Sequence, residues 1–499
     1  MVLAVHRGDS DGFGDSRFRG LQTRSQGRTR DEKSVMNSLY NKLPVFAQNA
    51  ACTISGLNRA RTRYSPLFER SLDHLQDSVN EPLETLHAFQ WMRLRELVER
   101  AREFSPHYSG ISPPIDAATP LESIERTLAQ IPVLEKDVYR DRPETFVAAD
   151  VPRRQILRGK TSGTTGTALS LYYSRQTLAE EYATVWRLRA QHGVGTRDRH
   201  LTFGGQLIVP VSQANPPFWR NNAYQRQILF SIYHMTKRNQ EAYVDAIHSH
   251  PALYADGYPS ALYQAAQSML ELGRPLPPDR LKAIFTSSES LLAYQREAIE
   301  EAFGASVWDR YGTAEFTVSM TECAEHNLHV DMEYCVVEVE PREETDEYVR
   351  GPLLVTGLAN DVTPFLRYRI GDSGTRLKHP CPCGRAGDAF LDVDGRSDDY
   401  VVTPDGRKIG RLDHIFKSQR SVIEAQIRQD DVNEIDVLYV PSASFDGHSE
   451  AALESEIRSR VGDQITIRLA EVDSIPRESN GKFRAVKSQV GRVEHRRSD

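Results

Sequence analysis

A short loop at residues 161–166 combines four hydroxyl side chains with two glycines, a composition that suits phosphate binding. Glycines let a backbone approach a ligand closely, and successive N–H groups can converge on an anion. Hydroxyl groups add donors that reorient around phosphate oxygens. A Walker A loop is excluded, because no Lys-Ser or Lys-Thr pair follows the last glycine. Taken alone, the loop is either a phosphate cradle or an ordinary hairpin turn, and its residues are Thr161, Ser162, Gly163, Thr164, Thr165 and Gly166.

Four further polar stretches follow along the chain, and the first two come directly after stretches that read as strands. Any one of them alone could be an ordinary polar turn. They lie at 286–289 (T-S-S-E), 311–315 (Y-G-T-A-E), 367–372 (R-Y-R-I-G-D) and 395–399 (G-R-S-D-D), and the last is paired with 475–482 (I-P-R-E-S-N-G-K).

The elements that must position these stretches alternate between strand and helix from about residue 150 to 370. Such alternation predicts α/β layering with a largely parallel central sheet, in which ligands bind at strand ends. The expected strands lie at 199–203, 281–286 and 306–311, and the expected helices at 240–248, 260–272 and 295–303.

The ends of the chain differ in composition from this middle part. Residues 1–35 carry few apolar side chains and are predicted to be a disordered tail, so that Met36 is an alternative start to Met1. The large domain is expected at 36–395, and its residues 40–108 show a helical pattern. A small mobile α+β domain is expected at 396–490, with strands at 400–402, 435–440 and 465–469 and a helix at 451–461, followed by a basic tail at 491–499.

Composition excludes several classes of protein. The 499-residue chain has a net charge of −7 and no basic stripe with interleaved aromatics, which argues against a nucleic-acid partner. No apolar run approaches the roughly 18–20 residues that span a bilayer, so no membrane association is expected. Five cysteines are too few for a disulfide framework, which predicts a reducing compartment, with the cytoplasm as the default.

In this order and spacing, the polar stretches resemble the adenylate-forming superfamily of acyl-CoA synthetases, adenylation domains and luciferases, over roughly residues 85–490. The phenylacetate–CoA ligase-like branch is most similar. Within it, 395–417 (G-R-S-D-D-Y-V-V-T-P-D-G-R-K-I-G-R-L-D-H-I-F-K) and 255–260 (A-D-G-Y-P-S) look like a subgroup of capsule and exopolysaccharide gene sets, itself similar to synthetases that adenylate a deazaflavin coenzyme. The resemblance implies a large N-terminal domain of layered α/β sheets and a small C-terminal domain.

The resemblance also implies a reaction in which a carboxylate attacks the α-phosphate of ATP, and an acceptor then displaces AMP. The loop at 161–167 would hold the β- and γ-phosphates, Glu315 would bind Mg²⁺, and Thr313 would contact the α-phosphate. Lys482 would bridge the reacting oxygens from a flexible loop. Further implied contacts are Asp372 to the ribose, Arg396 to ribose or phosphate, Asp398 as the hinge, and Ser288, Glu289, Tyr311 and Gly312 around the nucleotide.

One residue departs from the pattern of this family. Many relatives have lysine directly after the last glycine of the phosphate loop, where this chain has Thr167. The departure weakens the inferred grip on pyrophosphate without removing the N–H groups, and Lys160 could compensate.

The substrate acid and the acceptor are open. The acid pocket is expected around Phe203, Gly204, Gly205, Tyr258, Pro259 and Ser287, which suit an aryl or compact polar acid. No basic residue there is placed to bind a second substrate carboxylate. The acceptor is CoA by default in this branch, an amine is the alternative, and a noncatalytic nucleotide-binding protein is a further alternative. The candidate assembly is a homodimer.

Cysteines and a histidine suggest a second site. Cys323 and His329 lie about fifty residues before Cys381 and Cys383, which flank Pro382. Thiolates and imidazole in this number match the tetrahedral preference of a structural Zn²⁺. His326 or Cys335 could replace one ligand, and a pair of reduced cysteines beside a surface histidine is the alternative.

Overall fold

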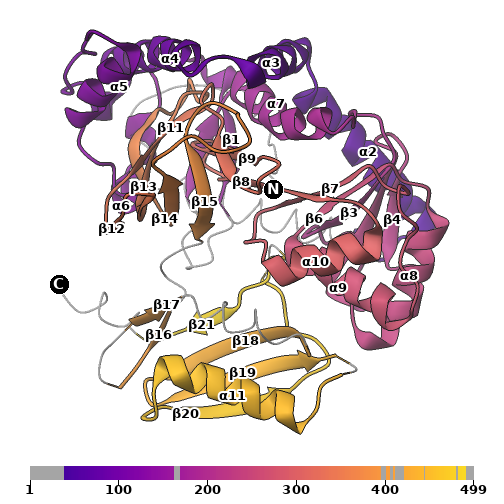
Figure 1. The fold of residues 1–499 in the computed structure, drawn as a ribbon. Helices are drawn as coiled ribbons and strands as arrows, with labels where there is room; N and C mark the ends of the chain where they lie inside the picture. Colours follow the sequence, from indigo (N-terminus) through magenta and orange to yellow (C-terminus); the bar gives the residue numbers. More distant parts are fainter. Residues whose placement is uncertain are drawn as a thin grey trace, which may run out of the picture.

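The computed structural model describes residues 39–161, 169–394, 400–404, 408–410, 421–442, 444–478 and 481–490. Figure 1 shows a row of N-terminal helices above a long sheet, with helices against the sheet and the C-terminal strands and helix, in yellow, below it. Within the described ranges, no helix combines the length and apolarity needed to cross a membrane.

The N-terminal segment is helical, as its apolar spacing predicts. The helices are α2 (Val45–Arg63), α3 (Pro66–Asp77), α4 (Leu83–Phe104), α5 (Pro120–Ala129) and α6 (Lys136–Asp141). Helix α4 buries Leu94, Val98 and Ala101 completely, because residues spaced by three and four share one face. It ends before Pro106, which disfavours helical backbone at Ser105. Short 3₁₀ turns are η1 (Ser78–Asn80), η2 (Pro106–Tyr108), η3 (Pro143–Phe146), η4 (Arg153–Gln155), η5 (Ile232–His234) and η6 (Lys237–Asn239).

A 13-stranded sheet organises the large part of the molecule, in the order β11-β13-β14-β15-β10-β9-β8-β7-β6-β3-β5-β4, with β12 paired to β13. The strands are β3 (His200–Gly204), β4 (Trp219–Asn222), β5 (Gln227–Ser231), β6 (Tyr254–Gly257), β7 (Ala283–Ser287), β8 (Val307–Gly312), β9 (Ser319–Glu322), β10 (Leu328–Val330), β11 (Cys335–Val339), β12 (Glu343–Glu344), β13 (Tyr348–Gly357), β14 (Phe365–Leu377) and β15 (Ala389–Asp394). Strands β1 (Leu157–Lys160) and β2 (Ser170–Tyr173) form a separate pair.

The prediction of a largely parallel sheet is wrong for half of this sheet. The pairs β5/β3, β3/β6, β6/β7 and β7/β8 are parallel. Beyond β8 every pair is antiparallel, from β8/β9 through β13/β11. The reason is connectivity, because the strands after β8 follow one another without intervening helices, and parallel neighbours need a crossover.

Helices cover both faces of the parallel strands. The strand residues Tyr254, Ala283 and Phe285 pack with residues of α3 and α7 (Arg175–Gln191). Their sequence neighbours Ala255 and Ile284 point the other way, into a core with α8 (Gln240–Ser249), α9 (Pro259–Glu271) and α10 (Ala293–Phe303). This alternation follows from the two-residue period of a strand.

The C-terminal part forms its own sheet and core. Strands β18 (Val422–Asp431), β19 (Glu434–Pro441), β20 (Thr466–Glu471) and β21 (Val486–Ser488) lie in the order β20-β19-β18-β21. Helix α11 (Gly447–Val461) buries Leu453 and Ile457 in their core, and β16 (Tyr400–Val402) pairs with β17 (Lys408–Gly410). The α+β composition agrees with the prediction, whereas the expected hinge at 398 lies outside the described residues.

Candidate active site and cysteine–histidine cluster

Two of the predicted polar stretches, 286–289 and 311–315, lie at the carboxyl ends of the adjacent parallel strands β7 and β8. Strand β3 ends at Gly204, β6 at Gly257, β7 at Ser287 and β8 at Gly312. A Cβ at Gly257 would lie 2.5 Å from the carbonyl oxygen of Phe203, so only glycine permits this approach of β6 to β3. Strand ends of this kind collect ligand-binding residues in α/β sheets.

Tyr311 and Asp372 are brought together from separate strands, β8 and β14. The Tyr311 hydroxyl donates a hydrogen bond of 2.6 Å to Oδ2 of Asp372. Burial, followed by the charge of Asp372, raises the pKa of Tyr311 well above its usual value, so the hydroxyl stays protonated and remains a donor. The bond fixes the position of the Asp372 carboxylate beside Tyr311, which lies near the carboxyl end of β8.

Glu315 lies beside a lysine that the sequence did not suggest. The Glu315 side chain is buried, and its Oε1 lies 3.4 Å from Nζ of Lys136. Lys136 begins α6, and a backbone bridge between Leu134 and Tyr368 holds this helix start against β14. No motif marks Lys136 in the sequence. Thr313 lies nearby in the chain and shares a hydrogen bond of 3.0 Å with Thr317.

Glu289, which follows β7, forms a hydrogen bond with the C-terminal part of the chain. Its Oε2 accepts the backbone N–H of Ser260 at 3.2 Å, and its Oε1 accepts the backbone N–H of Phe483 at 2.6 Å. Ser288, just before it, has a φ of 76°, a left-handed conformation that is uncommon for serine. Such strained residues are frequent at functional sites.

The loop that carries Lys482 packs against the end of β3. A Cβ at Gly481 would lie 2.3 Å from Cα of Gly205 and 3.0 Å from the Tyr233 hydroxyl oxygen, and Gly481 has a φ of +80°. Only glycine satisfies both conditions. Lys482 is half-buried directly after this contact.

Arg477 fixes the start of the same loop. Its side chain is 4% exposed and pairs with the equally buried Glu424 on β18. It also donates to Oγ of Ser260 at 2.9 Å and lies over the ring of Phe483, 5.0 Å from its centroid. Arg477 lies within the predicted motif at 475–482, where no role was assigned to it. Its buried contact with Ser260 of α9 indicates that it joins the loop to the large part of the molecule.

The residues expected to line the acid pocket occupy different environments. Phe203 is fully buried and stacks on Phe230, with centroids 4.6 Å apart, so its ring belongs to the core. Tyr258 is 7% exposed, and burial raises its pKa to about 12. Gly204 ends β3 and Gly205 follows it, Pro259 begins α9, and Ser287 ends β7 with partial exposure.

Several predicted site residues lie outside the described residues: Ser162, Gly163, Thr164, Thr165, Gly166, Thr167, Arg396 and Asp398. The base of the phosphate loop is described. Thr161 and Leu169 face each other there, with Thr161 N–H to the Leu169 carbonyl at 3.1 Å and Leu169 N–H to Thr161 Oγ1 at 2.9 Å. Lys160 ends β1 with an exposed side chain.

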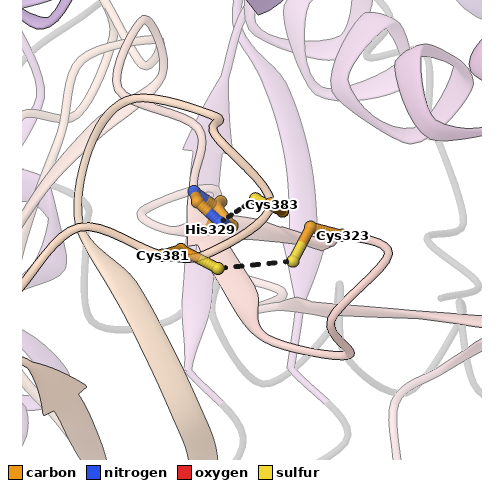
Figure 2. A group of neighbouring side chains, drawn as sticks. All are labelled: Cys323, His329, Cys381 and Cys383. Carbon is orange, nitrogen blue, oxygen red and sulfur yellow. Dashed lines mark hydrogen bonds between the residues drawn. The ribbon is translucent and has the colours of Figure 1, made fainter.

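The predicted zinc ligands Cys323, His329, Cys381 and Cys383 converge, with their ligand atoms all within 4.8 Å of one another. Figure 2 shows the four side chains pointing at a common centre, with Cys323 Sγ 3.8 Å from Cys381 Sγ and Cys383 Sγ 3.3 Å from His329 Nε2. Zn–S bonds of about 2.3 Å in a tetrahedron give S···S separations of about 3.8 Å. Burial lowers the pKa of His329 to about 4, so its imidazole is the neutral form that binds metals. The cluster is therefore compatible with zinc.

The alternative ligands lie elsewhere. Nδ1 of His326 lies 3.3 Å from a carboxylate oxygen of Glu322, and its side chain is 52% exposed. The buried thiol of Cys335 donates to the carbonyl oxygens of Ser319 and Asp331.

A buried network of charges extends from the cluster into the large part of the molecule. Arg385, two residues after Cys383, donates to Asp331 at 3.0 Å and to Thr321 at 2.8 Å. Asp331 is fully buried and also pairs with Arg187 of α7. Since buried charges depend on their partners, the network ties the segment 381–385 to α7, β9 and the residues after β10.

Comparisons with known proteins agree with this architecture. A model of the CapK C-terminal domain family matches residues 401–489. Protein CapK of Staphylococcus aureus is 26% identical over 462 residues, covering 90% of this chain and 98% of CapK. Indoleacetate–lysine synthetase of Pseudomonas savastanoi is 26% identical over 254 residues, covering 49% of this chain and 59% of the synthetase.

Solved structures extend the comparison to the fold. The crystal structure of 2-hydroxyisobutyryl-CoA ligase in the postadenylation state, in complex with R3-HIB-AMP, superposes with a TM-score of 0.59 at 21% identity, covering 81% of this chain and 90% of the ligase. The same ligase with 2-HIB-AMP and CoA in the thioesterification state gives a TM-score of 0.50 at 21% identity, covering 83% and 92%.

The long mixed sheet, the strand-end site and the small C-terminal sheet define the fold of adenylate-forming enzymes. Along nearly its whole length the chain is similar to CapK, its C-terminal part matches the CapK C-terminal domain family, and it shares the fold of 2-hydroxyisobutyryl-CoA ligase.

Proposed function

We propose that this protein is an AMP-forming ligase that activates a carboxylic acid through an acyl-adenylate. The observation that carries the proposal is the docking of the Lys482 loop at the strand ends, through Gly481 against Gly205 and through Phe483 on Glu289. This contact supports the proposal because it sets the neighbours of Lys482 against the ends of β3 and β7, and β7 pairs with β8, the strand that carries Tyr311.

The chemistry requires positive charge, because a carboxylate must approach a polyanion. A carboxylate oxygen forms a bond to the α-phosphorus of ATP, the bond to the β-phosphate oxygen breaks, and pyrophosphate leaves with its electron pair. Lys482 would stabilise the charge that develops on the oxygens around the α-phosphorus. Lys136, held 3.4 Å from Glu315, offers a second cation at the same site.

Mg²⁺ fits the donor set at Glu315, since a buried carboxylate is a ligand that this hard cation prefers. When bound, Mg²⁺ would neutralise phosphate charge. Glu315 would hold it, with Lys136 released toward the phosphates. Asp372, oriented by Tyr311, would accept both ribose hydroxyls, since a carboxylate has two oxygens with lone pairs for a diol.

The relatives support two candidate acceptors, CoA and an amine. The structural relative is a CoA ligase that has been seen with CoA, which supports transfer to CoA. The matched synthetase joins indoleacetate to lysine, which supports transfer to an amine. In both cases the acceptor's sulfur or nitrogen attacks the acyl carbon, loses its proton, and AMP leaves.

A structural Zn²⁺ is proposed at the Cys323–His329–Cys381–Cys383 cluster. All four protein ligands would occupy the tetrahedron, so no position is left for water and a catalytic role is not proposed.

The test is carboxylate-dependent exchange of labelled pyrophosphate into ATP over a broad panel of acids, followed by product analysis with CoA and with amines. We expect exchange with at least one class of acid. Lack of exchange across the panel, with intact ATP binding, would contradict the proposal.

A further inference from the structure

Two arginines of α2 lie next to each other and contact neutral side chains. Arg59 and Arg63 are one helical turn apart on α2. Arg59 Nη1 donates to the side-chain oxygen of Gln206 at 3.1 Å, and the guanidinium of Arg63 lies 4.3 Å from the ring centroid of Tyr182. In the part of the chain that the structure describes, no carboxylate forms an ion pair with either arginine.

Without a bound anion, this arrangement of two neighbouring arginines destabilises the folded state. Nε of Arg59 is buried and has no hydrogen-bond partner among the described residues. Burial, and then the charge of Arg63, lower the pKa of Arg59, because like charges one turn apart repel each other. A buried donor without a partner commonly marks a missing ligand or water. Both features favour an anionic ligand at this place.

The pair lies at the candidate active site. On one side, Gln206 directly follows Gly205, the residue against which Gly481 of the Lys482 loop packs. On the other side, Arg63 and Tyr182 lie close enough to Tyr173, the last residue of β2, to change the pKa of its hydroxyl: beyond the effect of burial, which raises that pKa, Tyr182 raises it and Arg63 lowers it.

Tyr173 connects the pair to the other edge of the site. Its ring contacts Phe316, the residue after Glu315, with centroids 4.9 Å apart. Its hydroxyl is also buried, and no described residue forms a hydrogen bond with it. Pairwise contacts thus lead from Gln206 through the two arginines to Tyr173 and Phe316. Two guanidinium groups and a hydroxyl can together donate several hydrogen bonds to one anion.

This inference rests on the proposed function. We propose that Arg59 and Arg63 bind a second anionic group of the substrate acid, at the end opposite the carboxylate that is activated. The substrate is then a dicarboxylic acid or a carboxylic acid that carries a phosphate. Guanidinium forks match either group in a bidentate manner, and the Tyr173 hydroxyl adds a donor. No motif in the sequence indicates this subsite, because its arginines lie on α2, far along the chain from the polar stretches that suggest the active site.

The test compares matched acids in pyrophosphate exchange: butyrate with succinate, valerate with glutarate, and glycerate with 3-phosphoglycerate. We expect kcat/KM to be at least tenfold higher for the acid with two anionic groups in one or more pairs. In Arg59→Gln and in Arg63→Gln that ratio should fall at least tenfold. Arg61→Gln, a neutralised and exposed arginine of the same helix, is the control and should keep it.

Two results would overturn the subsite. One is equal or better activation of the monoanionic acid in every pair. The other is a rise in the KM for ATP in the Arg59 and Arg63 variants with an unchanged ratio between acids, because the arginines would then bind ATP phosphates.

A binding measurement separates this inference from the ligase activity. Glutarate and 3-phosphoglycerate should raise the melting temperature of the wild type more than valerate and glycerate do, and this difference should vanish in Arg59→Gln. If no acid supports exchange but the difference is found, the proposed function fails while the anion subsite stands. If exchange occurs and no dianion stabilises the protein selectively, the subsite is wrong while the function stands.

Discussion

The backbone N–H of Phe483, the residue after Lys482, donates a 2.6 Å hydrogen bond to the carboxylate of Glu289. The same carboxylate accepts the N–H of Ser260 at the start of α9. Glu289 thus joins the loop of the C-terminal part to the strand ends of the large part, and it does so next to the lysine on which the proposed chemistry depends.

Loss of this carboxylate should loosen the loop. In Glu289→Ala both N–H groups lose a charged acceptor, an interaction worth about 1.5–3 kcal/mol. We expect faster amide hydrogen exchange at Phe483 and about tenfold slower pyrophosphate exchange. Glu301→Ala, which removes an exposed carboxylate from α10, is the matched control. Unchanged protection of Phe483 in Glu289→Ala would show that the contact does not hold the loop.

Tyr311→Phe tests the orientation of Asp372. The variant removes the 2.6 Å hydrogen bond and leaves the ring, so the proposed ribose acceptor loses its fixed position. We expect the KM for ATP to rise about five- to tenfold. Tyr334→Phe removes a comparable buried bond of 2.5 Å to Glu181 and controls for loss of stability. Equal KM values for ATP in the two variants would argue against a nucleotide role for the Tyr311–Asp372 pair.

The cysteine–histidine cluster predicts that the protein binds zinc. Purified protein should contain about one zinc per chain, and Cys381→Ser should lose it, since structural sites use four ligands. Chelation should lower the melting temperature of the wild type, because the cluster anchors the segment that leads through Arg385 into the buried network. Cys52→Ala removes a cysteine that lies outside the cluster and should retain zinc. Metal-free wild-type protein of unchanged stability would contradict the assignment.

Asp309 predicts a pH dependence of stability. Burial raises the pKa of Asp309 to about 6, against the 2.6 Å hydrogen bond from Thr286, which lowers it. Because the pKa in the folded state exceeds the unfolded value of about 3.9, the folded state binds the proton more tightly and loses this stabilisation as pH rises from about 4 to about 6. Asp309→Asn should therefore gain about 2 kcal/mol relative to the wild type between pH 4 and pH 7, measured by denaturant unfolding. A pH-independent difference would mean that Asp309 titrates normally.

Local patterns in the sequence predict much of the fold. The spacing of Leu94, Val98 and Ala101 indicates α4, and the stretches at 281–286 and 306–311 indicate β7 and β8. The direction of the strands after β8 was not predictable from periodicity, since a strand's two-residue pattern is the same in parallel and antiparallel sheets.

The candidate site was predictable only where its residues sit in ordered motifs. The four ligands of the cysteine–histidine cluster were predicted from residue type and spacing, and they converge. Lys136, Arg59 and Arg63 were not predicted, because each lies on an ordinary helix and acquires its partners through contacts between distant segments. No local signal distinguishes such a residue from a solvated one.

The central claim concerns Lys482 and is tested most directly by one comparison. Lys482→Ala is measured beside the wild type for acid-dependent pyrophosphate exchange and for ATP binding. We predict a loss of exchange of about 100- to 1,000-fold or more with ATP affinity changed less than about threefold, because the lysine acts mainly on the charge of the transition state. Full exchange activity in Lys482→Ala would contradict the account.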